Sequence, residues 1–250
     1  MRQDSLKGRS ALVTGGAQRI GRHIAIACAE AGMNVVVHYH KSRSDAERLA
    51  GELARKGVCA WAVGADLNRP GGCEAVVGKA RSLCGGSLSL LINNASVFPE
   101  HSLPLVAFVD IADTVRTNAW APLCLSRAFA GKARRGSIVN LLDARIAGND
   151  KNHAAYILSK HMLATLTKMC AIEFAPGIRV NAVAPGLILP PAGKSDGYLN
   201  KLKKTVPLRA HGTPCDVADA VLFLARSSFI TGEIIFVDGG KHLLRCGSEY

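Results

Sequence analysis

Short hydrophobic runs alternate along the chain with longer stretches in which apolar positions recur at helical spacing. Several of the short runs are almost continuously apolar, which is typical of parallel strands buried on both faces of a sheet. The runs predict strands at Ala11–Val13, Asn34–His38, Ala60–Val63, Leu88–Ile92, Ser137–Leu141, Arg179–Val183 and Ile234–Val237. The stretches between them predict helices over residues 20–31, 43–56, 72–83, 111–130, 153–175 and 214–226.

This alternation predicts an α/β fold built on a doubly wound, mostly parallel seven-stranded sheet with helices on both faces. We expect one catalytic domain over residues 1–250, because no long low-complexity linker interrupts the pattern. Thr213 and Pro214 predict the start of the last helix. Residues 186–207 are rich in Gly and Pro and follow the sixth strand, at the sheet edge where such folds bind ligands. They predict a mobile substrate flap, with an ordinary surface loop as the alternative.

Composition narrows the location and the partners that we expect. No apolar run reaches the length of a membrane span and no signal-like segment opens the chain, which predicts a cytoplasmic protein without membrane contact. The eight cysteines are scattered, which predicts reduced thiols and neither disulfides nor a metal site. The net charge of +12 is compatible with nucleic acid or an anionic cofactor. Because no nucleic-acid-reading motif accompanies it, nucleic-acid binding is the weaker interpretation.

A glycine-rich turn, TGGAQRIG at residues 14–21, follows the first predicted strand and opens the first predicted helix. Turns in this position typically wrap the pyrophosphate of a dinucleotide, because small residues let the backbone approach the phosphates. Gly15, Ile20 and Gly21 are therefore candidate cofactor contacts. Arg19 is the exception, since the turn by itself gives no reason for a long cation at that position.

The second predicted strand ends in a polar and basic run. Its residues are His38, Tyr39, His40, Lys41 and Ser42. Folds that bind NAD usually place a carboxylate here to hold the 2′-hydroxyl of the adenine ribose. Basic groups would instead attract a 2′-phosphate, so the run predicts NADPH as the cofactor. The alternative is a solvated basic loop.

Tyr156 and Lys160 lie four residues apart on a predicted helix, so they share one face. A nearby ammonium should lower the pKa of the tyrosine and make the phenol a better proton donor or acceptor near neutral pH. Lys160 could also donate hydrogen bonds to a ribose. Such a pair is common on helix surfaces, but its combination with the preceding glycine-rich turn is specific.

Together these motifs resemble the short-chain dehydrogenase/reductase family, with a Rossmann-type fold, from Thr14 to the Val237–Gly240 segment. The family's catalytic Asn, Ser, Tyr and Lys correspond to Asn118, Asp143, Tyr156 and Lys160, so an aspartate stands where serine is expected. The resemblance implies further cofactor contacts at Asp66, Leu67, Asn94, Ala95, Pro185 and Gly186, with Tyr156 and Lys160.

Asp143 changes the substrate that we expect. A serine hydroxyl would steady a carbonyl oxygen, whereas an ionised carboxylate would repel a developing alkoxide. A carboxylate can instead accept hydrogen bonds from N–H groups, or protonate a ring nitrogen when it is itself protonated. The site therefore suits a nitrogen heterocycle. A degraded, inactive site is the other interpretation, and the intact Tyr156 and Lys160 speak against it.

Four departures from the general family pattern agree with one subgroup, the pteridine reductases. That subgroup pairs the aspartate with an arginine in the first turn, the His-Tyr-His-basic-Ser run, and Asn-Ala-Ser after the fourth strand. The resemblance implies that a pterin stacks between Phe98 and the nicotinamide, that Ser96 contacts cofactor or pterin, and that Arg19 reaches both. The implied substrate contacts are Arg19, Ser96, Phe98, Asp143 and Tyr156.

The sequence thus predicts an NADPH-dependent pteridine reductase that transfers hydride to a C=N bond of pterins, with dihydropterin, dihydrobiopterin and dihydrofolate as candidate substrates. Tyr156 would protonate the adjacent nitrogen, supported by Asp143 and Lys160. The family resemblance also implies a homotetramer with residues 111–130 and 153–175 at an interface. Alternatives are a reductase of another carbonyl compound, such as a 3-oxoacyl thioester, and a catalytically silent protein that binds NADP or nucleic acid.

Overall fold

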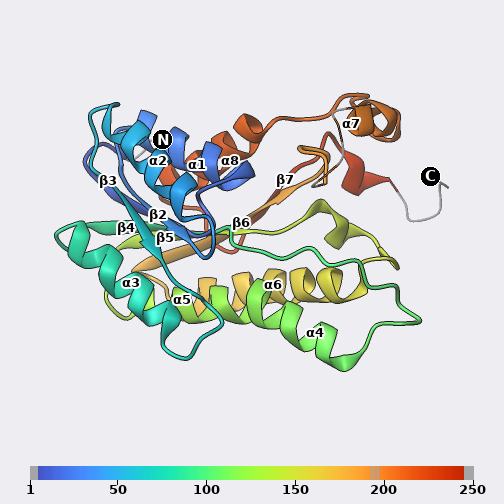
Figure 1. The fold of residues 1–250 in the computed structure, drawn as a ribbon, viewed down its shortest axis with the longest axis horizontal. Helices are drawn as coiled ribbons and strands as arrows, with labels where there is room; N and C mark the ends of the chain where they lie inside the picture. The colour runs from blue at the N-terminus through green and yellow to red at the C-terminus, as the bar shows by residue number, and fades with distance from the viewer. Residues whose placement is uncertain (1–4, 192, 194, 196, 245–250) are drawn as a thin grey trace.

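A computed structural model describes residues 5–191, 193, 195 and 197–244, and these residues form a sheet covered by helices on both faces (Figure 1). The sheet has seven strands in the order β3-β2-β1-β4-β5-β6-β7. Every neighbouring pair is parallel. The predicted doubly wound fold is confirmed. The strand order reverses between β1 and β4, which is where such folds open a crevice for a dinucleotide.

The observed elements agree with the predicted strands to within two residues at each end. The strands are β1 Ser10–Val13, β2 Asn34–Tyr39, β3 Ala60–Gly64, β4 Leu88–Asn93, β5 Gly136–Leu141, β6 Ile178–Pro185 and β7 Ile234–Val237. The helices are α1 Arg19–Glu30, α2 Arg43–Ala54, α3 Gly72–Leu83, α4 Phe108–Val115, α5 Ala121–Ala130, α6 Ala154–Glu173, α7 Gly197–Leu202 and α8 Pro214–Arg226. Short 3-10 turns lie at Ala144–Ala147, Lys203–Thr205 and Lys241–Leu243.

Two hydrophobic layers hold the sheet between the helices. Helices α1, α2 and α8 cover one face, while α3, α5 and α6 cover the other (Figure 1). Consecutive strand residues point to opposite layers, so that Val13 packs under α1 and Leu12 packs toward α3. Both faces are therefore buried, which explains why the strands read as continuous apolar runs.

The predicted helix over 111–130 differs from the structure. Helix α4 begins earlier, at Phe108, and a π-helical turn at Arg116–Trp120 separates it from α5. Asn118 lies in that turn, and its side chain pairs with the backbone of Val97 in both directions, at 2.8 and 2.9 Å. Turns of this kind occur frequently at functional sites, and this one brings the Asn118 side chain to the Val97 backbone.

Residues 186–207, predicted as a flap, contain helix α7 and a 3-10 turn in addition to loop. Residues 192, 194 and 196 of this segment lie outside the described residues. The start of α8 is as predicted, because Thr213 caps the helix and its backbone N–H and hydroxyl both donate to Asp216, each at 2.7 Å.

The cysteines at positions 28, 59, 73, 84, 124, 170 and 215 are free thiols, while Cys246 lies outside the described residues. None of the helices in the described ranges is long and apolar enough to cross a membrane. Within the same ranges, no group of three or more His, Cys, Asp and Glu side chains is arranged to hold a metal ion.

The glycine-rich turn between β1 and α1 is packed against the end of β4. The Asn94 amide donates to the carbonyl oxygens of Thr14 and Gly15, at 2.9 and 3.0 Å. A methyl group on Gly21 would meet the Gly15 oxygen and lie 2.5 Å from the Asn94 amide nitrogen. Only glycine fits at position 21 without displacing the turn.

Gly21→Ala should therefore destabilise the protein by about 1–3 kcal/mol through overpacking. Gly51→Ala is the matched control, because Gly51 lies in α2 and a methyl group there meets no atom within 4 Å. That change should stabilise the helix by about 0.5–1 kcal/mol. Chemical denaturation of both variants measures the two effects, and equal stability changes would contradict the described packing.

Candidate active site

Asp143 and Tyr156 meet at the carboxyl edge of the sheet. Asp143 follows the end of β5 by two residues, and Tyr156 lies in the first turn of α6. The Tyr156 hydroxyl donates a hydrogen bond to the Asp143 carboxylate over 2.9 Å. The other carboxylate oxygen accepts the backbone N–H of Arg145 at 2.8 Å. The acid that replaces serine is therefore bonded directly to the catalytic tyrosine of the predicted set.

The pKa of Tyr156 differs from the sequence prediction. Burial raises this pKa well above its usual value, and the neighbouring Asp143 charge and hydrogen bond raise it further. The Lys160 ammonium, which was expected to lower the pKa, lies 5.6 Å from the centre of the Tyr156 ring. Tyr156 is thus held as a protonated phenol whose proton points at Asp143.

Lys160 is buried beneath the site, and its ammonium donates to the Leu141 carbonyl oxygen at 2.8 Å. Burial lowers the pKa of this lysine to about 8, although the Asp143 charge partly opposes the shift. The charge of Lys160 therefore changes in a pH range that an assay can reach, which is rare for a lysine.

Asn118 shapes the loop beside the site. Its side-chain oxygen accepts the Ser96 hydroxyl at 3.0 Å, and its amide nitrogen donates to the Ser159 hydroxyl at 3.1 Å. With the two bonds to Val97, these contacts fix the segment that follows β4. Ser96 is exposed at this position and lies on the segment that carries Phe98.

Phe98 lies beside Tyr156, at the edge of the site. Its ring meets the Tyr156 ring edge-on, with 4.6 Å between the ring centres. A second aromatic neighbour is the imidazole of His153, which stacks on Phe98 at 4.3 Å and 14°. Phe98 remains 43% exposed, so part of its ring is open to a ligand.

Sequence reasoning missed His153, Arg145 and Lys241 as members of the site. His153 precedes Tyr156 by three residues, so helical spacing could have placed both on one face. Arg145 holds its guanidinium carbon 5.0 Å from the centre of the Phe98 ring. Lys241 comes from the segment after β7; its pKa is lowered by burial and by Arg145, against the opposing charge of Asp143. Nothing in the sequence near Lys241 indicates this approach.

Some of the predicted cofactor residues are buried and support the glycine-rich turn, whereas others are exposed at the surface. His38 supports the turn, since it is buried and its Nδ1 accepts the Gly15 N–H at 3.3 Å. Burial lowers its pKa to about 4, so the imidazole is neutral and holds the turn from below. Tyr39 packs against Gly64, whereas His40 and Lys41 are exposed at the end of β2 and Ser42 is half-buried. The basic surface is consequently smaller than the sequence indicated.

The remaining predicted cofactor residues lie around the same crevice. Asp66 follows β3, accepts the Asn68 N–H at 3.0 Å and stands 4.0 Å from His40. Leu67 is half-buried beside it. Pro185 ends β6, and a methyl group on Gly186 would lie 2.5 Å from the Cβ of Asp238. The tight turns at Gly21 and Gly186 and the exposed His40 and Lys41 fit a phosphorylated dinucleotide.

Arg19 extends from the glycine-rich turn to the segment that follows β6. Its backbone has a φ of 51°, which costs a residue with a side chain about 1–2 kcal/mol. Its guanidinium donates to the Pro190 carbonyl oxygen at 2.7 Å and thereby joins the first turn to the segment after β6. Strain retained at such a position points to a function for the side chain.

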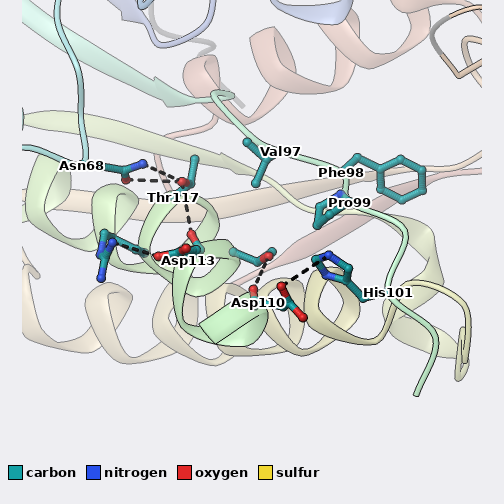
Figure 2. Close-up of a pocket in the computed structure, with 10 residues that line it drawn as sticks. Asn68, Val97, Phe98, Pro99, His101, Asp110, Asp113 and Thr117 are labelled. Atoms are coloured by element: carbon teal, nitrogen blue, oxygen red, sulfur yellow. Dashed lines mark hydrogen bonds and ion pairs between the residues drawn. The ribbon is translucent and has the colours of Figure 1, made fainter. Parts of the chain in front are cut away.

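A cavity of about 660 Å³ lies between the segment that carries Phe98 and helix α4 (Figure 2). Of the predicted site residues, Phe98 alone lines it, together with residues of α4. His101 points toward Asp110 in this view, at 3.6 Å, while the Phe98 ring points away from Asp110 and Thr117. The residues that line this cavity do not include Asp143, Tyr156 or Lys160, whereas Phe98 both lines the cavity and contacts Tyr156.

Comparisons with known proteins agree with this geometry. A family model described as enoyl-(acyl carrier protein) reductase matches residues 15–242. The 3-oxoacyl-[acyl-carrier-protein] reductase FabG of Staphylococcus aureus is 35% identical over 245 residues, covering 94% of this chain and 98% of the relative. Among solved structures, FolM alternative dihydrofolate reductase 1 of Brucella canis, complexed with NADP, superposes with a TM-score of 0.90 at 29% identity, with 98% of each chain covered. Its counterpart from Brucella suis, also with NADP, gives 0.91 at 30% identity, over 96% of this chain and 97% of that one.

The sheet order, the glycine-rich turn and the Tyr156–Lys160 pair define an oxidoreductase that binds a dinucleotide. The chain belongs to the short-chain dehydrogenase/reductase family. It is an NAD(P)-dependent reductase of that family.

The buried Lys160 should make stability depend on pH. Its pKa is about 8 in the fold against 10.5 unfolded, so the unfolded chain binds the extra proton between these values. The free energy of unfolding should therefore rise with pH across that window, by about 3 kcal/mol in total. Lys160→Met should lose this rise, whereas Lys168→Met, on the exposed side of α6, should keep it. Denaturation curves from pH 7 to 10 measure this, and identical slopes in all three proteins would contradict the burial cost.

Proposed function

We propose that the protein is an NADPH-dependent pteridine reductase, which reduces a C=N bond in dihydropterin, dihydrobiopterin or dihydrofolate to give the tetrahydro form. The observation that carries the proposal is the 2.9 Å hydrogen bond from Tyr156 to Asp143. It puts a carboxylate, with the proton donor already attached, where a ketone reductase would present a neutral hydroxyl.

The carboxylate favours a substrate that donates hydrogen bonds. Each Asp143 oxygen accepts one bond in the structure, from Tyr156 and from the Arg145 backbone, and retains a lone pair for a second donor. Ring N–H and amino groups of a pterin are such donors. A developing alkoxide would meet a negative charge instead, which raises the barrier to carbonyl reduction.

NADPH, when bound, supplies the hydride to a ring carbon. Tyr156 holds the proton for the adjacent nitrogen and delivers it directly or through a water molecule. Its raised pKa keeps that proton in place until the nitrogen becomes basic. Lys160, whose ammonium lies 5.6 Å from the centre of the Tyr156 ring, would offset the negative charge that remains on the Tyr156–Asp143 pair, and Asp143 holds the phenol in position.

The cofactor would lie along the carboxyl edge of the sheet. Gly15, Ile20 and Gly21 would meet the pyrophosphate, and the exposed His40 and Lys41 would meet the 2′-phosphate. The two NADP complexes among the similar structures support this choice of nucleotide. Further contacts would come from Asp66, Leu67, Asn94, Ala95, Ser96, Pro185, Gly186, Tyr156 and Lys160.

Arg19 would bridge the cofactor phosphates and the pterin ring. The strained backbone at this residue and its bond to Pro190 support a position over the crevice. Phe98 would stack on the pterin from the side opposite the nicotinamide, since part of its ring is exposed next to Tyr156. Two of the similar structures are named dihydrofolate reductases, and folates contain a pterin ring, so these names support the proposed substrate class.

A 3-oxoacyl thioester is the second candidate substrate. The FabG relatives from Staphylococcus aureus favour it, at 35% identity over nearly the whole chain. Asp143 speaks against it for the electrostatic reason above. A homotetramer also fits, because apolar side chains are exposed on α6 and on the π-helical turn before α5; they are Trp120, Leu158, Met162, Met169 and Ile172.

Purified protein with NADPH should consume the cofactor when dihydrobiopterin or dihydrofolate is added. The rate is followed by the loss of reduced-nicotinamide absorbance. A 3-oxoacyl thioester serves as the comparison substrate, and kcat/KM should be at least about tenfold higher for one of the pterins. Turnover of the thioester with neither pterin reduced would overturn the proposal.

Asp143→Ser should separate substrate chemistry from cofactor binding. We expect kcat/KM for the pterin to fall by about 100-fold, since the carboxylate contacts the reacting ring only in this reaction. The Kd for NADPH should stay within about twofold, and thioester reduction should rise. Asp113→Ser, which removes an exposed carboxylate paired with Arg116, is the control and should leave all three values unchanged. Parallel loss of NADPH binding and pterin turnover would refute the role of Asp143.

A further inference from the structure

Six residues form a closed ring of contacts, which is called the circuit below; they are Tyr156, Asp143, Arg145, Asp150, His153 and Phe98. The Tyr156 hydroxyl donates to the Asp143 carboxylate, and the backbone N–H of Arg145 donates to the same carboxylate. The Arg145 guanidinium then donates to Asp150 at 2.7 Å. His153 contacts the same Asp150 oxygen at 2.9 Å. The stack of His153 on Phe98 and the edge contact of Phe98 with Tyr156 close the circuit.

Asp150 pairs with both Arg145 and His153 in this circuit. One of its oxygens meets both Arg145 and His153, and the other accepts the Asn152 N–H at 2.9 Å. Although burial alone would raise its pKa, the Asn152 hydrogen bond and the Arg145 and His153 contacts lower it overall. Asp150 therefore stays ionised and holds the two side chains that flank the Phe98 ring.

The backbone reinforces the same arrangement. A β-bridge joins His101 to His153, and the N–H of Ala154 donates to the His101 carbonyl oxygen at 3.0 Å. The Leu103 N–H donates to the Lys151 carbonyl oxygen at 2.8 Å. The segment that carries Phe98 is thus fastened to the start of α6, three residues before Tyr156.

We infer that His153 is a positioning residue for the aromatic wall of the site. Its imidazole covers one face of Phe98 and so fixes the ring edge-on to Tyr156. The exposed part of Phe98, 43% of the residue, is then held in one orientation beside Tyr156, where a planar heterocycle can contact it. This inference rests on the proposed function for the identity of that heterocycle, a pterin. Asp150 and Arg145 hold His153 in the stacked orientation.

His153→Ala should raise KM for the dihydropterin by about 5- to 10-fold, since the wall loses its fixed orientation, while kcat changes less than about twofold. His153→Phe should restore KM to within about twofold, because a ring again stacks on Phe98. His153→Gln, which keeps a polar group without a ring, should not. His161→Ala, at an exposed histidine of the same helix, is the control and should match the wild type.

An unchanged KM in His153→Ala, in a wild-type background that reduces pterins, would overturn the inference and leave the proposed function standing. A fall in kcat with all substrates would also overturn it, because it would indicate a general structural role. If the wild type reduces no pterin, the proposed function fails separately. The stack is then judged by proton NMR, where the His153 ring resonances should move in Phe98→Leu; resonances that stay in place would reject it.

Discussion

The hydrogen bond from the Tyr156 hydroxyl to the Asp143 carboxylate is the interaction on which the rest of the site depends. It holds the phenol protonated, because both burial and the adjacent negative charge raise the pKa of Tyr156. With the Arg145 N–H on the other oxygen, it leaves each carboxylate oxygen one lone pair for a further donor. The proposed preference for N–H donors over oxyanions rests on this carboxylate.

The fold explains why these groups can meet. Parallel strands bring the ends of β1, β4 and β5 to one edge, and α6 crosses beside them with Tyr156 and Lys160 on its buried face. Desolvation has opposite consequences for the two residues. It raises the pKa of Tyr156, so the phenol keeps its proton, and it lowers the pKa of Lys160, so the ammonium loses its proton more easily.

The sequence predicted the strands, the sheet type and the glycine-rich turn, because hydrophobic periodicity and glycine placement depend on local geometry. The family resemblance also placed Asp143, Tyr156 and Lys160 in one site, and the structure brings these three side chains together. Other features depend on tertiary packing, and sequence patterns do not carry that information. The burial of His38 below the turn, the raised pKa of Tyr156 and the approach of Lys241 from the end of the chain are of this kind. The π-helical turn at Asn118 is another such feature, because the Asn118 side chain forms two hydrogen bonds with the backbone of Val97, a residue on a distant part of the chain.

If the proposed function holds, hydride passes to a ring carbon of a pterin in a site organised by Asp143. Reduction of dihydrobiopterin with NADPH deuterated at the transferable position of the nicotinamide, followed by NMR of the product, tests it most directly. The account predicts one deuterium on a carbon of the pterin ring, beside the newly protonated nitrogen. A product without deuterium in the ring, from an enzyme that transfers deuterium to the carbonyl carbon of a 3-oxoacyl thioester, would contradict it.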